Sequence, residues 1–287
     1  MSISMQTNVA SIRSQRNLAK ATNSFTGSIE KLSSGLRINR AGDDAARSAI
    51  SSQMTAHERG LKQATRNAND AISVVQTAEG GVNEIANSLT RMRELAVQSS
   101  TDGTMQRSDR RKLDTEFRIL LKRVAQISRK HEFNGQKLFD GSISGSANAL
   151  NFQIGMNNNA NDRISLSIDG LGRTELGLSN AQNGGGGGLY VEYATHAQIM
   201  IDKLDIALES INTVRSSLGA TQNRLEATIS NLGTMYENMA TSNSRLKDVD
   251  VADETAKFTR NQILSQAATS MLAQSNSLPQ SALSLIG

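Results

Sequence analysis

The sequence predicts a mainly α-helical protein, built as a long antiparallel helical bundle or coiled coil with paired chain ends and a small β-hairpin region. Aromatic residues make up only 3% of the 287 residues, although such side chains, which bury about 150–250 Å² each, usually anchor a compact core. The only proline is Pro279, so no proline breaks a helix before it. Small and apolar residues also recur every seven positions, which is typical of helices that pack along extended seams.

The longest predicted helix begins after Asp43 and Asp44, which can cap its first turn, and ends before Thr101, Asp102 and Gly103. At ~1.5 Å per residue it is ~85 Å long. Two interleaved rows of small and apolar residues share one stripe of it. These rows are Met54, Leu61, Ala68, Val75, Val82, Leu89 and Ala96, and Ala64, Ala71, Ala78, Ile85 and Met92.

Two further predicted helices show the same alternation of three- and four-residue steps, and we expect all three to bury their stripes against one another as an elongated bundle. The shorter helix carries Leu113, Phe117, Leu120, Val124 and Ile127. The longer one carries Ile201, Leu204, Leu208, Ile211, Leu218, Leu225, Ile229, Leu232, Tyr236 and Met239, interrupted by Arg215 and Gln222.

The two chain ends carry thinner seams. The first contains Leu18, Phe25, Ile29 and Leu32, and the second contains Leu264, Met271, Leu278 and Leu285, which recur every seven residues. Both ends are otherwise rich in Ser, Asn, Gln and Ala. Because so little apolar surface is marginal for an isolated helix, we expect each end to need a partner helix.

The middle of the chain has a different character. Asn134-Gly135, Asp140-Gly141 and Asp169-Gly170 are turn signals. The segments NFQIGM and RISLSID alternate apolar and polar residues on either side of NNNAND, which predicts a β-hairpin. The glycine run 184–188 lacks the Lys-Ser/Thr ending of a phosphate-binding loop, so we interpret it as a connection.

Several classes of function are disfavoured. The absence of cysteine removes disulfides, thiolate metal ligands and thiol nucleophiles. His57, His131 and His196 share no metal-ligand spacing, and no Ser-His-Asp signature is present, so we expect no metal, no cofactor and no enzymatic activity. The start MSISMQTNVAS lacks the layout of a cleaved signal peptide, and no segment is apolar enough to span a membrane.

Nucleic-acid binding is a weaker alternative. The net charge is +4 and the pI about 9.5, but acidic residues accompany the basic ones. The densest basic run, residues 107–112, contains Asp109 and no aromatic residue, which is typical of a solvated helix face. We therefore expect no nucleic-acid partner, and salt-dependent DNA binding would test the alternative of a basic DNA-binding coiled coil.

Segments in both terminal thirds resemble the bacterial flagellin family. They are KLSSGLRINRAGDDAARSAI (31–50), QATRNANDAISVVQTAEG (63–80), LTRMRELAVQSS (89–100), EFNGQKLFDG (132–141) and NQILSQAATSMLAQSNSLPQSALSLI (261–286), in the order of the family. The resemblance implies a structural subunit that polymerises into the flagellar filament for swimming. A hook–filament junction protein, which shares the terminal helices, is the alternative, but LSSGLRIN and the ending favour flagellin.

The resemblance also implies a domain organisation. Residues 1–42 and 246–287 would form an inner terminal coiled-coil domain, so that Leu18, Phe25, Ile29, Leu32, Leu264, Met271, Leu278 and Leu285 belong to polymerisation seams. Residues 43–140 and 190–245 would form a helical rod domain. Residues 141–189, a β-hairpin and glycine-rich connection, would replace the variable outer domain of longer flagellins.

The partners implied by the resemblance are other copies of the chain, the flagellar type III export apparatus and its chaperone, and the filament cap and hook-junction proteins. The protein would be secreted without a cleaved signal into an extracellular filament. In the family, the segment resembling LTRMRELAVQSS forms the patch that Toll-like receptor 5 reads. The matching positions of this segment are Arg91 and Leu95, and Glu116 on the following helix completes the candidate patch. Leu95 lies off both apolar rows of its helix, so we expect it to be exposed.

Overall fold

The computed structural model describes residues 7–102, 105–178 and 190–283, without the side chains of residues 278–283. The glycine run 184–188 thus lies outside the described residues. Long helices and two small antiparallel strand pairs confirm the predicted mainly α-helical class. The chain divides into two compact units, Met1–Glu58 with Glu237–Gly287, and Arg59–Tyr236. The predicted boundaries of the inner coiled-coil domain and the rod domain describe layers of an assembled filament, so they stay a prediction.

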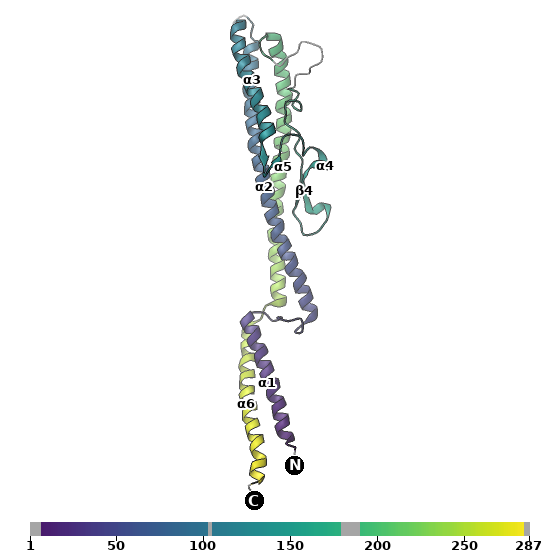
Figure 1. The fold of residues 1–287 in the computed structure, drawn as a ribbon, viewed down its shortest axis with the longest axis vertical. Helices are drawn as coiled ribbons and strands as arrows, with labels where there is room; N and C mark the ends of the chain where they lie inside the picture. Colours follow the sequence, from purple (N-terminus) through teal and green to yellow (C-terminus); the bar gives the residue numbers. More distant parts are fainter. Residues whose placement is uncertain (1–6, 103–104, 179–189, 284–287) are drawn as a thin grey trace. The chain divides into compact units, whose positions relative to one another are not determined.

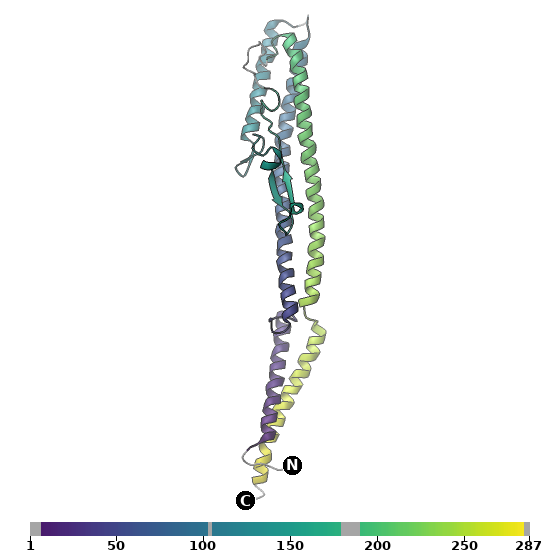
Figure 2. The same ribbon diagram turned by 90° about the vertical axis from the view of Figure 1, so that its right-hand side faces the viewer.

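In the first unit, helix α1 (Val9–Ser34) and helix α6 (Val251–Leu283) lie side by side and antiparallel (Figures 1 and 2). Asn8 joins the start of α1 to the end of α6, because its side-chain Nδ2 donates to the Ser275 carbonyl at 2.9 Å. The Asn8 Oδ1 also caps α1 by accepting from the Ser11 backbone N–H at 3.0 Å. Helix α1 ends at Gly35, whose φ of 71° lies in the left-handed region that glycine adopts without strain.

The contact between α1 and α6 follows a heptad rhythm, but most of its side chains are small or polar. Its buried and half-buried residues at three- and four-residue steps are Ser11, Ser14, Leu18, Ala21, Phe25, Ser28 and Leu32 on α1, and Glu254, Phe258, Asn261, Ser265, Ala268, Leu272 and Ser275 on α6. The Ser11 Oγ, for example, donates to the Asn276 Oδ1 at 2.7 Å. Small side chains bury little apolar area, so this pairing is stabilised weakly by hydrophobic burial.

The connection after α1 is hydrogen-bonded to the end of helix α5 (Ala194–Lys247). The Arg37 backbone N–H donates to the Lys247 carbonyl at 2.7 Å, and the Arg37 Nη2 donates to the Leu246 carbonyl at 2.6 Å. The Val249 N–H in turn donates to the Gly35 carbonyl at 3.0 Å. A cationic side chain at a helix C-terminus satisfies carbonyls that have no partner within the helix.

Helices α2 (Ala45–Ser100), α3 (Arg107–Lys130) and α5 supply the core of the second unit (Figure 1). The predicted cap of α2 is confirmed, because the Asp44 Oδ1 accepts from the Arg47 N–H at 3.0 Å. From Leu61 to Ala96, every residue of the two predicted apolar rows is at most 2% exposed. The buried face of α5 carries Leu204, Ile211, Leu218, Leu225 and Leu232, as its pattern predicts.

Both turn-linked strand pairs lie in the second unit. Strands β1 (Glu132–Phe133) and β2 (Gln136–Lys137) flank Asn134 and Gly135, whose φ values are 50° and 79°. Strands β3 (Leu150–Gln153) and β4 (Arg163–Leu166) form the predicted antiparallel hairpin. Between the two pairs lies the single turn of α4 (Gly145–Asn148), and the short helix η1 (Ala160–Asp162) precedes β4.

The β3–β4 hairpin packs on α2. The Asn67 Nδ2 donates to the Gln153 carbonyl at 2.9 Å, and a Cβ placed on Gly60 would lie 3.4 Å from the Met156 Cβ. No helix in the described part of the chain combines the length and the apolar character needed to cross a bilayer.

Candidate assembly surface

Large apolar side chains are exposed on both helices of the α1–α6 pair. Ile29 is 43% exposed, Leu264 51% and Met271 64%. Other exposed apolar residues on these helices are Val9, Ile12, Val251 and Ile263. Leu264 and Met271 line one groove, and adjoining apolar side chains that are exposed usually mark a surface that another molecule covers.

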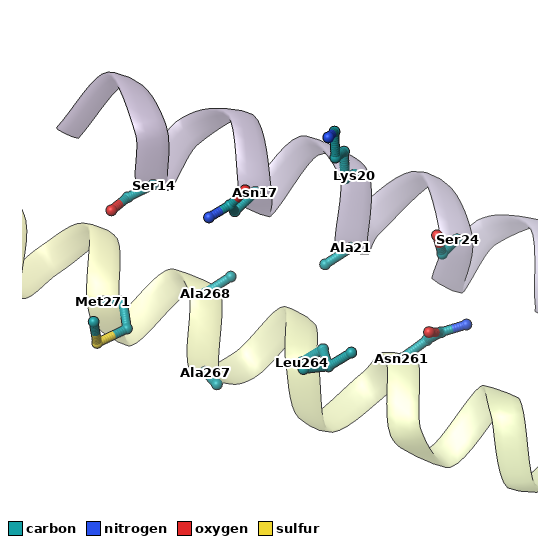
Figure 3. A pocket seen from close by; sticks show the side chains of 10 residues that line it. All are labelled: Ser14, Asn17, Lys20, Ala21, Ser24, Asn261, Leu264, Ala267, Ala268 and Met271. Carbon is teal, nitrogen blue, oxygen red and sulfur yellow. The ribbon is translucent and has the colours of Figure 1, made fainter. Parts of the chain in front are cut away.

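A groove of about 500 Å³ runs along this pair. Figure 3 shows Ala21 of α1 and Ala268 of α6 pointing toward one another, while Leu264 and Met271 lie along the α6 side. The other lining residues are Ser14, Asn17, Lys20, Ser24, Asn261 and Ala267. Because side chains of α1 in the groove are mostly small, the space between the helices can accept large apolar side chains from outside.

The predicted seam residues are divided by this arrangement. Leu18, Phe25 and Leu32 are half-buried in the α1–α6 contact, whereas Ile29, Leu264 and Met271 are exposed. For Leu278 the side chain, and for Leu285 the whole residue, lies outside the described part of the chain.

The α1–α6 contact on α6 uses a different row from the one that its apolar pattern emphasises. Phe258, Ser265 and Leu272 recur every seven residues on the side that faces α1. A sequence search for the most apolar row misses them because a serine interrupts the row. The sequence signal that could have identified this row is the presence of Phe25 near one chain end and Phe258 near the other, in a chain with few aromatic residues. In the structure their rings stack on each other.

The expected exposure of Leu95 is wrong, because its side chain is 0% exposed. Val74, Gly81, Ser88 and Leu95 form a third buried row on α2, seven residues apart. Helix α2 packs against both α3 and α5, and a helix with two partners needs a wider buried face than a two-helix seam. This row escapes the apolar pattern because Gly81 and Ser88 interrupt it.

Arg91 and Glu116, the other two predicted receptor residues, lie together on the surface. The Arg91 Nε donates to the Glu116 Oε1 at 2.9 Å, and the Arg91 Nη1 donates to the Glu94 Oε2 at 2.8 Å. The hydrogen bonds to Glu116, and secondly to Glu94, raise the pKa of Arg91. These carboxylates and the guanidinium form a polar, charged patch that joins α2 to α3.

Two further arginine contacts join the helices of the second unit. Arg93 binds both carboxylate oxygens of Asp205, at 2.6 and 3.2 Å, and these hydrogen bonds lower the pKa of Asp205. Arg111 and Arg107 both donate to Glu192 at 2.8 Å and lower the pKa of its carboxyl. The segment before α5 is thereby fixed to α3.

The histidines are used for packing where the structure shows their surroundings. The His131 Nε2 lies 2.8 Å from the Thr77 carbonyl oxygen, and its ring stacks on Phe139 with centroids 5.0 Å apart. The ring of His196 lies against Tyr190 at 4.7 Å. Among the described residues, no group of three His, Cys, Asp or Glu side chains could hold a metal ion.

Comparisons with known proteins match this helical architecture. A model of the bacterial flagellin N-terminal helical region matches residues 5–144, and a model of the bacterial flagellin C-terminal helical region matches residues 201–286. A flagellin from Halalkalibacterium halodurans is 42% identical over 279 residues, covering 97% of this chain and 98% of the relative.

Two further similarities bear on the alternatives. The flagellar filament 30.7 kDa core protein of Treponema maltophilum is 36% identical over 282 residues, covering 97% of this chain and 98% of the relative. A flagellar hook-associated protein from Vibrio parahaemolyticus has a similar fold, with a TM-score of 0.57, 11% identity and coverage of 72% of this chain and 100% of that one. At this identity the likeness shows the fold alone.

The two family models and the full-length relatives favour a filament subunit over a hook–filament junction protein and over an enzyme. The chain therefore belongs to the bacterial flagellin family, and it is a structural subunit of the flagellar filament.

Proposed function

We propose that neighbouring subunits in the filament meet through the exposed apolar residues of α1 and α6. The observation that carries this proposal is the exposure of Leu264 and Met271 on the α6 side of a groove whose other lining includes small side chains such as Ala21 and Ala268. Ile29 is a further exposed apolar side chain on α1. Burying each of these side chains in a neighbour would contribute about 1–3 kcal/mol per contact. Repeated along a polymer, such contacts would stabilise the filament although the α1–α6 pair itself buries little.

A charged substitution tests the assembly face. Leu264→Asp should abolish polymerisation, because a buried carboxylate without a partner is costly, while the second unit stays folded. Asn231→Asp is the matched control, since it adds the same charge at an exposed position of α5 in the second unit. Sedimentation of seeded polymer and electron microscopy would report assembly, and circular dichroism would report folding. Normal filaments from Leu264→Asp would refute the proposed face.

The proposed route to the filament begins with secretion of the unfolded chain through the flagellar export apparatus, assisted by an export chaperone. Assembly then starts on hook-junction proteins and continues at the filament tip beneath a cap. The flagellin family supports this route, and a chain without cysteine cannot form disulfides in transit. Immunoblots of culture medium should detect the protein from cells with an intact export apparatus. Equal amounts in medium from cells without it would contradict the proposal.

Toll-like receptor 5 is a further proposed partner of the patch around Arg91 and Glu116. The Arg91–Glu116 ion pair is exposed, so charged groups of a receptor could replace one partner of the pair and bind the other. Leu95, being buried, would act by supporting α2 from beneath. We expect Arg91→Ala to weaken receptor binding without lowering the melting temperature, and Leu95→Ala to lower the melting temperature. Unchanged receptor binding by Arg91→Ala and by Glu116→Ala would rule out the patch.

A further inference from the structure

A methionine side chain is exposed on the face that we propose for assembly. Of the described methionines, only Met235 and Met271 are exposed as large apolar side chains, at 46% and 64%. Met92 and Met200, by contrast, are 0% and 3% exposed in the core of the second unit. Susceptibility of a thioether to oxidation follows its access to solvent.

We infer that Met271 is an oxidation site, and that its conversion to the sulfoxide prevents a free subunit from entering the filament. The inference rests on the proposed assembly face. Met271 shares the groove with Leu264, Ala267 and Ala268 (Figure 3), so a contact made there by a neighbour is largely apolar. The oxidant is hydrogen peroxide, which reaches the side chain when a subunit is free in solution.

The chemistry balances with hydrogen peroxide alone. The Met271 Sδ attacks one peroxide oxygen, a sulfur–oxygen bond forms, and the oxygen–oxygen bond breaks. Proton transfer to the departing oxygen gives water, so the sulfide is oxidised to a sulfoxide by two electrons and the peroxide is reduced. The product is polar and chiral where the original side chain was apolar and flexible.

Oxidation acts differently on the free and the assembled subunit. In the free subunit the sulfoxide oxygen is hydrated, so the fold is hardly affected. In the filament the same oxygen would be covered by an apolar neighbour, and an unsatisfied buried polar group weakens a contact by about tenfold or more. A neighbour already in place also shields the sulfur from peroxide.

The first experiment measures how fast Met271 is oxidised in the free subunit and in the filament. Full-length subunits and filaments are treated with hydrogen peroxide, and peptide mass spectrometry follows each methionine with time. Met271 should gain one oxygen in the free subunit at least about tenfold faster than in the filament, whereas Met92 should stay unmodified in both. Equal rates at Met271 in the two states would overturn the inference.

The second experiment measures the consequence. Met271→Leu keeps an apolar side chain of similar size but cannot be oxidised, and Met235→Leu is the matched control at the other exposed methionine. After peroxide treatment, wild type and Met235→Leu should lose seeded polymerisation, and Met271→Leu should retain it. Equal loss in Met271→Leu and wild type would overturn the inference. If Leu264→Asp also forms no polymer, that equal loss refutes only the role of Met271 oxidation and the proposed assembly face is still supported. If Leu264→Asp forms normal polymer, the proposed assembly face itself is refuted.

Discussion

The rings of Phe25 and Phe258 stack on each other with centroids 5.0 Å apart and planes inclined by 27°. They are the largest side chains in a contact between α1 and α6 that is otherwise built mainly from small and polar residues. An offset aromatic pair contributes about 0.5–1.5 kcal/mol beyond its buried area. This single pair therefore carries a large share of the cohesion between the two chain ends.

Phe258→Ala should separate α1 and α6 in the free subunit. We expect a destabilisation of the pair by about 1–2 kcal/mol, less than for a fully buried phenylalanine because the ring is half-buried. Amide hydrogen exchange in α6 would measure it. Ile263→Ala removes an exposed apolar side chain of the same helix and is the control. Equal exchange rates in the two variants would show that the ring stack contributes nothing.

The free subunit should exchange its amide hydrogens faster in α1 and α6 than in α2, α3 and α5. The physical reason is that the α1–α6 contact buries little apolar surface, so opening it costs less free energy than opening the core of the second unit. Polymerisation should slow exchange in α1 and α6 by covering Ile29, Leu264 and Met271. Comparable protection of all helices in the free subunit would contradict this expectation.

Two adjacent glycines of α2 should respond in opposite ways to alanine. A Cβ on Gly81 would lie 2.5 Å from the Phe139 Cε2 and 2.8 Å from the His131 Nε2, whereas a Cβ on Gly80 meets nothing within 4 Å. Gly81→Ala should lower the free energy of unfolding by about 1–3 kcal/mol through overpacking. Gly80→Ala should raise it by about 0.5–1 kcal/mol through helix propensity. Denaturant titration would measure the free energy of unfolding of wild type and both variants. If Gly81→Ala is as stable as wild type or as Gly80→Ala, the close packing at Gly81 is contradicted.

Acid should weaken the attachment of the segment before α5. Arg111 and Arg107 hold the pKa of Glu192 below the ordinary value of a glutamate side chain. The stabilisation is therefore complete above that ordinary value and is lost as pH falls through the lower pKa of the folded state. Between pH 7 and pH 3 the melting temperature of wild type should therefore fall more than that of Glu192→Gln. Parallel falls would show that the carboxylate adds no stability in the folded protein.

Heptad spacing predicts the second unit well because each stripe there is both apolar and buried within one chain. The rows from Leu61 to Ala96 and the α5 row through Leu218 are examples. Spacing fails at Leu95 because the third buried row of α2 contains Gly81 and Ser88, which carry no apolar signal. On α6 the most apolar row, with Leu264 and Met271, is exposed in the single chain, so the predicted polymerisation seam there stays a prediction.

The exposed row on α6 shows that the sequence of one chain does not identify the partner that covers an apolar stripe. Apolar periodicity predicts that a stripe is covered but does not say by what, and a polymer subunit covers part of its surface with other copies. Small seam residues such as Ala21 and Ala268 are invisible to a search for large apolar side chains, although they let the two helices of one chain approach.

A density map of filaments grown from the purified protein tests the central claim most directly. The account predicts that Leu264 and Met271 are covered by apolar side chains of a neighbouring subunit, with the α1–α6 pair retained in each copy. The account would be contradicted if the protein forms no filament, or if both side chains face solvent in the map.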